Sequence, residues 1–174
     1  VNPVQATQQR TGDIAIILLL LSLACTPLNT LFGLPGLLKL RRPLGLYAFF
    51  YAGLHLLIYA GWDYSFDFSQ AAATVVEKRY LLVGMAALFL LSLLALTSHN
   101  FWKKKMRQRW KKLHRLVYLA AGLVVLHVAW VIKGYVARLS GDIWKPLAAG
   151  FTLALLLLAR IAPVRKFLST LRFK

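Results

Sequence analysis

Five apolar segments, each about as long as a bilayer is thick, limit what this chain can fold into. A helix that crosses the hydrocarbon core needs roughly 20 apolar residues, or about 17 at minimum, at a rise of about 1.5 Å per residue. Because lipid offers no hydrogen bonds to the backbone, such segments must be helical. The sequence therefore predicts one domain over residues 1–174, an all-α integral membrane protein with a bundle of five transmembrane helices. The predicted spans are 13–32, 44–62, 80–97, 113–132 and 144–162.

The composition agrees with a membrane protein and excludes several other classes. The chain is 59% hydrophobic with a mean hydropathy of +0.63, yet it carries a formal net charge of +17 in 174 residues. Its basic residues alternate with apolar spans and form no nucleic-acid motif, so contact with lipid headgroups is expected and nucleic acid is not. Cys25 is the only cysteine, which excludes an intramolecular disulfide, a cysteine-ligated iron–sulfur cluster and covalently attached haem. No glycine-rich phosphate loop is present, so ATP-driven pumping is not expected.

The placement of Lys and Arg predicts the orientation. One set of span ends, at 33–43, 97–113 and 160–174, holds fifteen of the 22 basic residues and no acid, whereas the opposite set holds all five acids. By the positive-inside rule the first set faces the cytoplasm, which puts the amino terminus outside and the carboxyl terminus in the cytoplasm. Because the chain begins outside and with Val rather than Met, a further helix or signal upstream is expected.

Two histidines are predicted at nearly equal depth inside the membrane. On outward-running spans, His55 lies roughly 18 Å and His127 roughly 21 Å from the cytoplasmic end. A histidine inside a span is costly and tends to mark a cofactor, an ion path or a proton relay. The pair could fill both axial positions of a haem iron, which favours electron transfer; alternatively, each ring makes an ordinary interhelical hydrogen bond.

The cytoplasmic edge holds a second, less complete constellation. His114 begins the fourth span, and Arg41 shares its depth on the second, within roughly 40° of the helix stripe of His55. One interpretation is a second haem, with His114 as a ligand and Arg41 near its other axial side or a propionate. The other is that Arg41 contacts lipid headgroups. On an ideal helix His114 and His127 are about 220° out of phase, so two haems would require either local tightening of the helix or approach from different sides. His99 is an alternative inner ligand, but an exposed loop position is expected.

The chain resembles a known family at several of these positions. Five segments are similar to the MsrQ or YedZ family: "RTG" (10–12), "LACTPL" (23–28), "LRRPLGLYAFFYAGLHLLIY" (40–59), "KRYLLVGMAALFLLSLLALTS" (78–98) and "RWKKLHRLVYLAAGLVVLHVAWVIK" (109–133). That family comprises haem-binding membrane subunits of the bacterial periplasmic methionine-sulfoxide reductase system, within the wider group of ferric-reductase-like transmembrane domains. The likeness covers about residues 10 to 133.

The resemblance implies a six-helix protein of the bacterial inner membrane, of which this chain lacks the first helix. It implies b-type haem iron ligated by His55 and His127 near the outer side, with His114 as ligand of an inner haem. Where ferric-reductase relatives have a histidine at the matching inner position, this chain has Arg41. No role is carried over to His99.

The resemblance also implies a place in electron transport. Electrons would come from the quinol pool or a cytoplasmic flavin reductase, with FMN and quinone as further candidate cofactors. They would pass to a periplasmic molybdenum-cofactor reductase, which itself reduces methionine sulfoxide, and the outer loops at 63–79 and 133–145 are candidate docking sites. The alternatives are a ferric reductase or quinol-linked cytochrome b that serves a small molecule, and a non-redox transporter or assembly factor.

Overall fold

The computed structural model describes residues 3–132 and 143–170, and in these ranges the chain is helical without a strand. A single π-helical turn, η1, follows the second helix. The elements, in chain order, are α1 Pro3–Phe32, α2 Gly36–Ile58, η1 Tyr59–Asp63, α3 Phe68–Glu77, α4 Arg79–Leu96, α5 Asn100–Met106, α6 Gln108–His114, α7 Leu116–Val131, α9 Trp144–Leu158 and α10 Ala162–Thr170.

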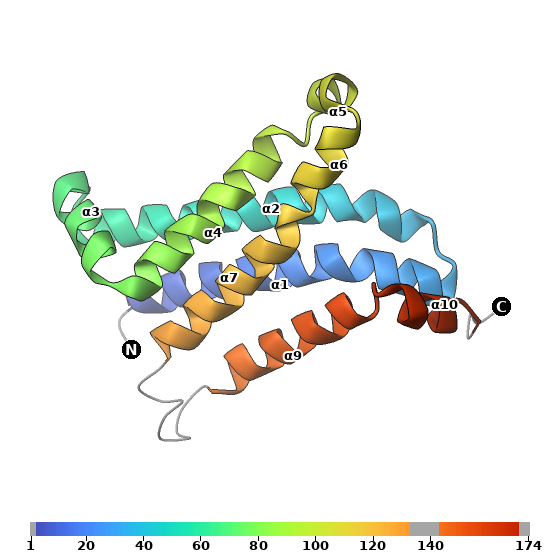
Figure 1. Cartoon of the computed structure of the whole chain (residues 1–174). Helices are drawn as coiled ribbons and strands as arrows, with labels where there is room; N and C mark the ends of the chain where they lie inside the picture. The colour runs from blue at the N-terminus through green and yellow to red at the C-terminus, as the bar shows by residue number, and fades with distance from the viewer. Residues whose placement is uncertain (1–2, 133–142, 171–174) are drawn as a thin grey trace.

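Two antiparallel helix pairs form the bundle. α1 packs along α2 and α4 packs along α7, and the second pair crosses the first diagonally (Figure 1). α9 covers the free side of α7 and also contacts α1. At one end of the molecule α5 and α6 project beyond the bundle, whereas α3 lies at the opposite end (Figure 1).

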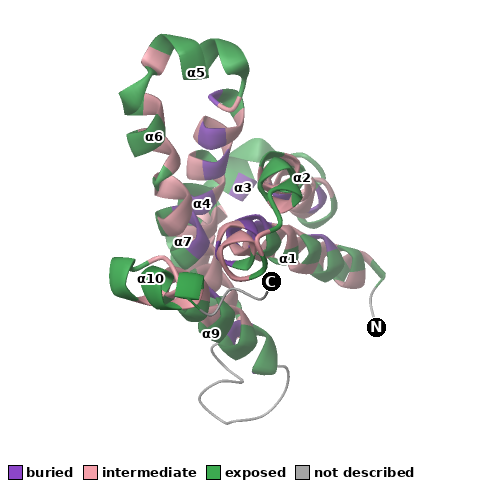
Figure 2. Cartoon of the chain, turned by 90° about the vertical axis from the view of Figure 1, so that its right-hand side faces the viewer, coloured by how far each residue is buried: buried purple, intermediate pink, exposed green. Residues whose placement is uncertain are grey.

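The core lies where the two pairs cross. Burial is concentrated along the inward faces of α1, α4 and α7, and the outer faces and the projecting ends are exposed (Figure 2). Small residues in this core let the helix backbones approach closely, as membrane helices commonly do. The buried core cluster consists of Leu19, Leu23, Ala48, Leu91, Ala120, Ala121 and Leu153.

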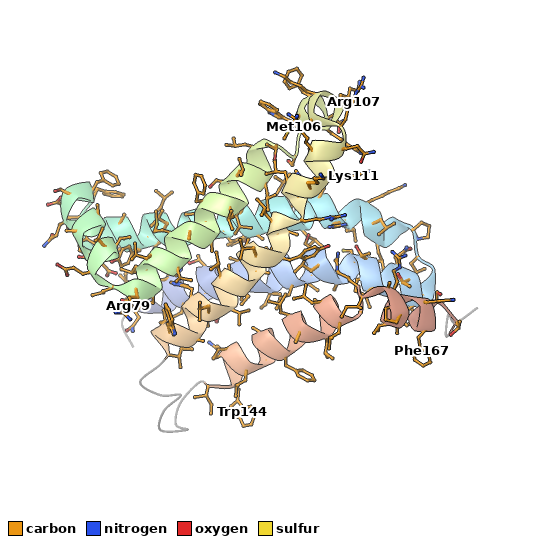
Figure 3. All side chains as sticks on the ribbon, viewed as in Figure 1. Arg79, Met106, Arg107, Lys111, Trp144 and Phe167 are labelled. Atoms are coloured by element: carbon orange, nitrogen blue, oxygen red, sulfur yellow. The ribbon has the colours of Figure 1, made fainter. Side chains whose placement is uncertain are left out.

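The prediction of an all-α integral membrane protein is confirmed. Four described helices are long and apolar enough to cross a membrane, and a fifth span results if α9 and α10 are counted together across their 83° bend. Large apolar side chains point outward from the bundle, as those of Trp144 and Phe167 do in Figure 3, and Phe89 is 69% and Leu96 is 72% exposed. An exposed apolar surface of this kind is suited to lipid.

The first helix is longer than expected, and its proline is compensated. α1 begins at Pro3 rather than near residue 13, because its polar first turns are helical as well. Pro27 lies inside α1 and has no N–H, so the carbonyl of Leu23 loses its helical donor. The Nη2 of Arg160, which follows α9, donates to that carbonyl at 2.6 Å, and its Nη1 donates to the Tyr118 hydroxyl.

Two connections expected as loops contain helices. Asp67 caps α3 by accepting hydrogen bonds from the backbone N–H groups of Ser69 and Gln70, both at 3.0 Å. His99 caps α5 in the same way, accepting from the N–H of Phe101 at 3.4 Å. α3 is amphipathic and adjoins the end of α2, so it suits the membrane interface rather than its interior.

Candidate functional site

His55 lies on α2 and its imidazole points at α1. The Nδ1 atom is 2.9 Å from the backbone carbonyl oxygen of Gln8, four residues before Gly12. The ring rests against Gly12, where an added Cβ would lie 3.3 Å from Nδ1. With the ring proton on Nδ1, the carbonyl accepts this hydrogen bond and Nε2 keeps a free lone pair.

His127 lies on α7 and has the same surroundings on the second helix pair. Its Nδ1 atom is 2.7 Å from the carbonyl oxygen of Tyr80, at the beginning of α4, and its ring rests against Gly84. The tyrosine ring lies beside the imidazole, with 6.2 Å between the centroids. This ring therefore also has Nδ1 engaged by a carbonyl and Nε2 available for a ligand.

The two imidazoles meet between the helix pairs. Their centroids are 6.5 Å apart and their planes are nearly perpendicular, at 85°. A metal–nitrogen bond of about 2.0–2.1 Å and a ring radius of about 1.2 Å place two imidazoles on opposite sides of one metal with centroids about 6.4 Å apart. The observed spacing therefore fits two axial ligands of one iron. Among the described residues, no group of three or more His, Cys, Asp or Glu side chains could hold a metal ion, so a cage built from protein ligands alone is not supported.

The backbone is irregular just beyond His55. The π-helical turn η1 begins four residues later, and such turns often occur at functional sites. The hydroxyl of Tyr59, the first residue of this turn, donates to that of Tyr64, just after it, at 3.1 Å. Ser65 and Phe66 follow with positive φ angles of 47° and 62°, which are uncommon for residues other than glycine. Sequence reasoning missed this turn, and no spacing signal in the chain would have identified it.

A cavity of about 500 Å³ opens at the other end of the bundle, between α1, α2, α4 and α6 to α7. His114 and Arg41 both line it, so the structure brings these two residues to one site. His99 is exposed and does not line this cavity. The rest of the lining is largely apolar and contains no acid. Its further cationic side chains are those of Arg42, Lys103, Lys111 and Arg115, and its hydroxyl groups belong to Ser22, Ser98 and Tyr118.

The inner histidine is held differently from the outer pair. His114 stacks on Trp110, with ring centroids 3.9 Å apart and an angle of 26° between the planes. Its Nδ1 lies 3.2 Å from the carbonyl oxygen of Trp110 on the preceding turn. Trp110 also donates its indole N–H to the carbonyl of Thr97 at 2.8 Å, which fixes this platform against the end of α4.

A local change of the helix reduces the phase difference between His114 and His127 without removing it. The helix is interrupted at Arg115, where the N–H of Arg115 bonds the carbonyl of Lys112 and the N–H of Tyr118 bonds the carbonyl of Arg115. Both bonds span three residues, as in a 3₁₀-helix, which turns about 120° per residue instead of about 100°. This tightening moves His114 toward the face of His127, in the direction that the sequence analysis required.

Arg41 is anchored to the first helix from the cavity wall. Its Nη1 lies 3.5 Å from the hydroxyl oxygen of Thr26, and its carbonyl accepts from Ser22 at 2.7 Å. These contacts turn the guanidinium toward the protein rather than outward to headgroups alone. The site can thus take an anionic ligand with an apolar body, as charge and lining both indicate.

Comparisons with known proteins agree with this architecture. Residues 11–125 match the family described as ferric reductase like transmembrane component. Proteins named protein-methionine-sulfoxide reductase heme-binding subunit MsrQ are similar over most of the chain. The one from Rhodospirillum rubrum is 44% identical over 163 residues, covering 93% of this chain and 75% of its own length. The one from Bordetella pertussis is 40% identical over 161 residues, with 92% and 76% covered. No solved structure matches the chain.

Proposed function

Since this chain belongs to the MsrQ family of haem-binding membrane subunits, we propose that it is a membrane cytochrome b that carries electrons across the bacterial inner membrane. The observation that carries the proposal is the 6.5 Å spacing of the His55 and His127 rings, which suits two ligands of one iron. The two rings come from different helix pairs, so folding of the bundle itself assembles the site.

The histidines would hold haem b through their Nε2 atoms. Each Nδ1–H is engaged by a backbone carbonyl, which fixes the tautomer and directs Nε2 away from its own helix pair. A bound haem supplies one-electron chemistry that no side chain here offers. His55 and His127 would hold the haem iron between them, and the haem would then serve electron transfer rather than catalysis at iron.

We assign the outer end of the bundle to the periplasm, because the opposite span ends carry most of the basic residues. The electron acceptor would be a periplasmic molybdenum-cofactor methionine-sulfoxide reductase, which performs the sulfoxide chemistry itself. The outer loop at 63–79 is the proposed docking region, since it carries α3 and follows η1, at the end of the helix that holds His55. Of the second predicted docking loop, residues 133–142 lie outside the described part of the chain.

The inner cavity would receive electrons from the cytoplasmic side. Its cationic lining and its volume of about 500 Å³ suit an anionic, largely apolar cofactor. A second haem ligated by His114, with Arg41 at its other axial side or at a propionate, is the proposal favoured by the meeting of these two residues. FMN and a quinone are the competing occupants, and the quinol pool or a cytoplasmic flavin reductase would be the donor.

A dithionite-reduced minus air-oxidised spectrum of the detergent-purified protein tests the proposal, with pyridine haemochrome quantification of haem per chain. Sharp b-type bands at one haem or more per chain are expected, and a ratio near two would support the inner haem. If the protein is produced in cells that synthesise haem and is still isolated without haem, the result would contradict the proposal and favour a non-redox role.

The alternative of a reductase for small molecules shares the haem pair and needs a different test. The haem of the protein is first reduced with a quinol. It should be reoxidised when the periplasmic sulfoxide reductase and oxidised methionine are added. Faster reoxidation by ferric chelates alone, with no effect of the partner, would favour a ferric reductase.

A further inference from the structure

Two glycines lie where the haem-site imidazoles touch the opposite helix. Gly12 is on α1 against His55, and Gly84 is on α4 against His127. An added Cβ on Gly12 would lie 3.3 Å from the Nδ1 atom of its histidine, and one on Gly84 would lie only 2.8 Å away. A carbon atom and a ring nitrogen that are not bonded clash at 2.8 Å, so an alanine at position 84 must push the imidazole aside.

The glycines also explain how each imidazole reaches a helical carbonyl. In an α-helix the carbonyl of one residue faces the N–H of the residue four positions later. The carbonyls that accept from the imidazoles belong to Gln8 and Tyr80, so the residues four positions later are Gly12 and Gly84 themselves. Without a Cβ at that position, the carbonyl is open to a second donor from the side.

The same arrangement occurs once in each helix pair. In both cases 47 residues separate the imidazole from its carbonyl, although no internal repeat is apparent in the sequence. Glycine inside a helix weakens it relative to alanine, so both positions need a reason in packing. Gly53 and Gly122, which share α2 and α7 with the histidines, have nothing within 4 Å of an added Cβ. Gly61 is also tightly packed, against Phe66, but among the described glycines only Gly12 and Gly84 approach an imidazole.

We propose that Gly12 and Gly84 are matched positioning residues that set the orientation of the two haem ligands and expose the carbonyls that bind their Nδ1–H groups. The inference rests on the proposed function, in which His55 and His127 hold haem b. A carbonyl that accepts from Nδ1–H raises the basicity of Nε2, so these contacts favour ferric over ferrous iron. Loss of either contact should therefore shift the midpoint potential to a more positive value.

The contact between Gly84 and His127 is tighter than the contact between Gly12 and His55, so we expect the larger effect from a substitution at Gly84. At Gly84 the added Cβ would also lie 2.9 Å from the Cε1 atom of His127, and the hydrogen bond there measures 2.7 Å. At Gly12 the corresponding distances are 3.4 Å and 2.9 Å, so a shift of a few tenths of an ångström suffices. We expect Gly84→Ala to lower the affinity for haem at least about tenfold, as loss of a supporting contact to a metal ligand does, and so to lower the haem content. Gly12→Ala should retain haem with a more positive potential.

The experiment compares four alanine variants of the membrane-inserted full chain. Gly84→Ala is paired with Gly122→Ala, and Gly12→Ala with Gly53→Ala, so that each helix pair has its own control. Haem per chain, the electron paramagnetic resonance signal of the low-spin ferric haem and the midpoint potential are measured, with size exclusion and circular dichroism as folding checks. The controls should match the wild type in all of them.

Wild-type chain without haem would contradict the proposed function. If the wild-type chain binds haem but both Gly84→Ala and Gly12→Ala leave the resonance signal and the midpoint potential unchanged, this inference is overturned and the proposed function stands. Equal shifts in Gly53→Ala and Gly122→Ala would also overturn it, because a general effect of alanine in these helices would then suffice. If Gly84→Ala does not fold, the comparison of Gly12→Ala with Gly53→Ala decides the question.

Discussion

The outer and inner ends of the bundle differ in the features that would bind a ligand. At the outer end two imidazoles face each other at 6.5 Å, each with a backbone carbonyl behind it. At the inner end one histidine lies on the wall of a 500 Å³ cavity among cationic side chains. Coordination geometry thus defines the outer site, whereas shape and charge define the inner one. The outer site should therefore be the more selective for a metal and the less tolerant of substitution.

Removal of an outer histidine gives the largest expected effect. His55→Ala and His127→Ala should each lower the low-spin haem signal at least about tenfold, because one axial ligand is lost outright. The measurement is the reduced minus oxidised spectrum with haem quantification. His99→Ala, in an exposed capping position, is the control and should retain the wild-type signal. Full haem in both outer variants would disprove the pair as ligands.

The inner end should respond more weakly to the same kind of change. His114→Ala is expected to remove at most one haem per chain and to leave most of the low-spin signal of the outer pair, which lies at the other end of the bundle. Arg41→Gln should have the same effect if the guanidinium serves the inner ligand. Haem stoichiometry and resonance spectra of both variants measure this. Collapse of the outer signal in His114→Ala would show that the two ends are not separable.

The proximity of His55 and His127 was easier to predict from the sequence than any other feature of the site. Five spans followed from apolar length, and equal depth indicated that His55 and His127 would meet. Gly12 and Gly84 fall in segments that resemble the family, but the sequence carried no signal of their packing role, because only the three-dimensional structure identifies what a helical glycine contacts. Depth could likewise be counted along each helix, whereas the direction of each ring could not.

Other misses have specific physical causes. α3 was expected as a loop because Gly, Asp and Ser dominate residues 61–69, although Asp67 followed by Gln70 is the spacing of a helix cap. The phase of His114 was computed on an ideal helix, and the interruption at Arg115 invalidates that assumption. The early start of α1 was hidden by polar residues, since hydropathy reports the lipid boundary rather than the end of a helix.

The two ends also differ in how their polar contacts should contribute to stability. At the inner end, Arg160 joins α9 to the Leu23 carbonyl and the Tyr118 hydroxyl, and its Nε is buried without a partner among the described residues. Arg160→Leu should lower the free energy of unfolding by about 1–3 kcal/mol, because it leaves a carbonyl without a donor. Thermal unfolding in detergent measures the change. An unchanged melting temperature would contradict the role of Arg160 in compensating Pro27.

The ion pair at the outer end should contribute least. Lys145 Nζ lies 3.0 Å from an Asp13 carboxylate oxygen, but the two side chains are 46% and 44% exposed. Water and salt screen such a pair, and holding two long side chains in place costs entropy, so Asp13→Asn should change the free energy of unfolding by less than about 0.5 kcal/mol. The same thermal assay, run beside Arg160→Leu, tests this ranking. A loss as large as that of Arg160→Leu would contradict the ranking. It would mean that the contact of Asp13 with Lys145 holds α9 at its outer end as strongly as Arg160 does at the inner end.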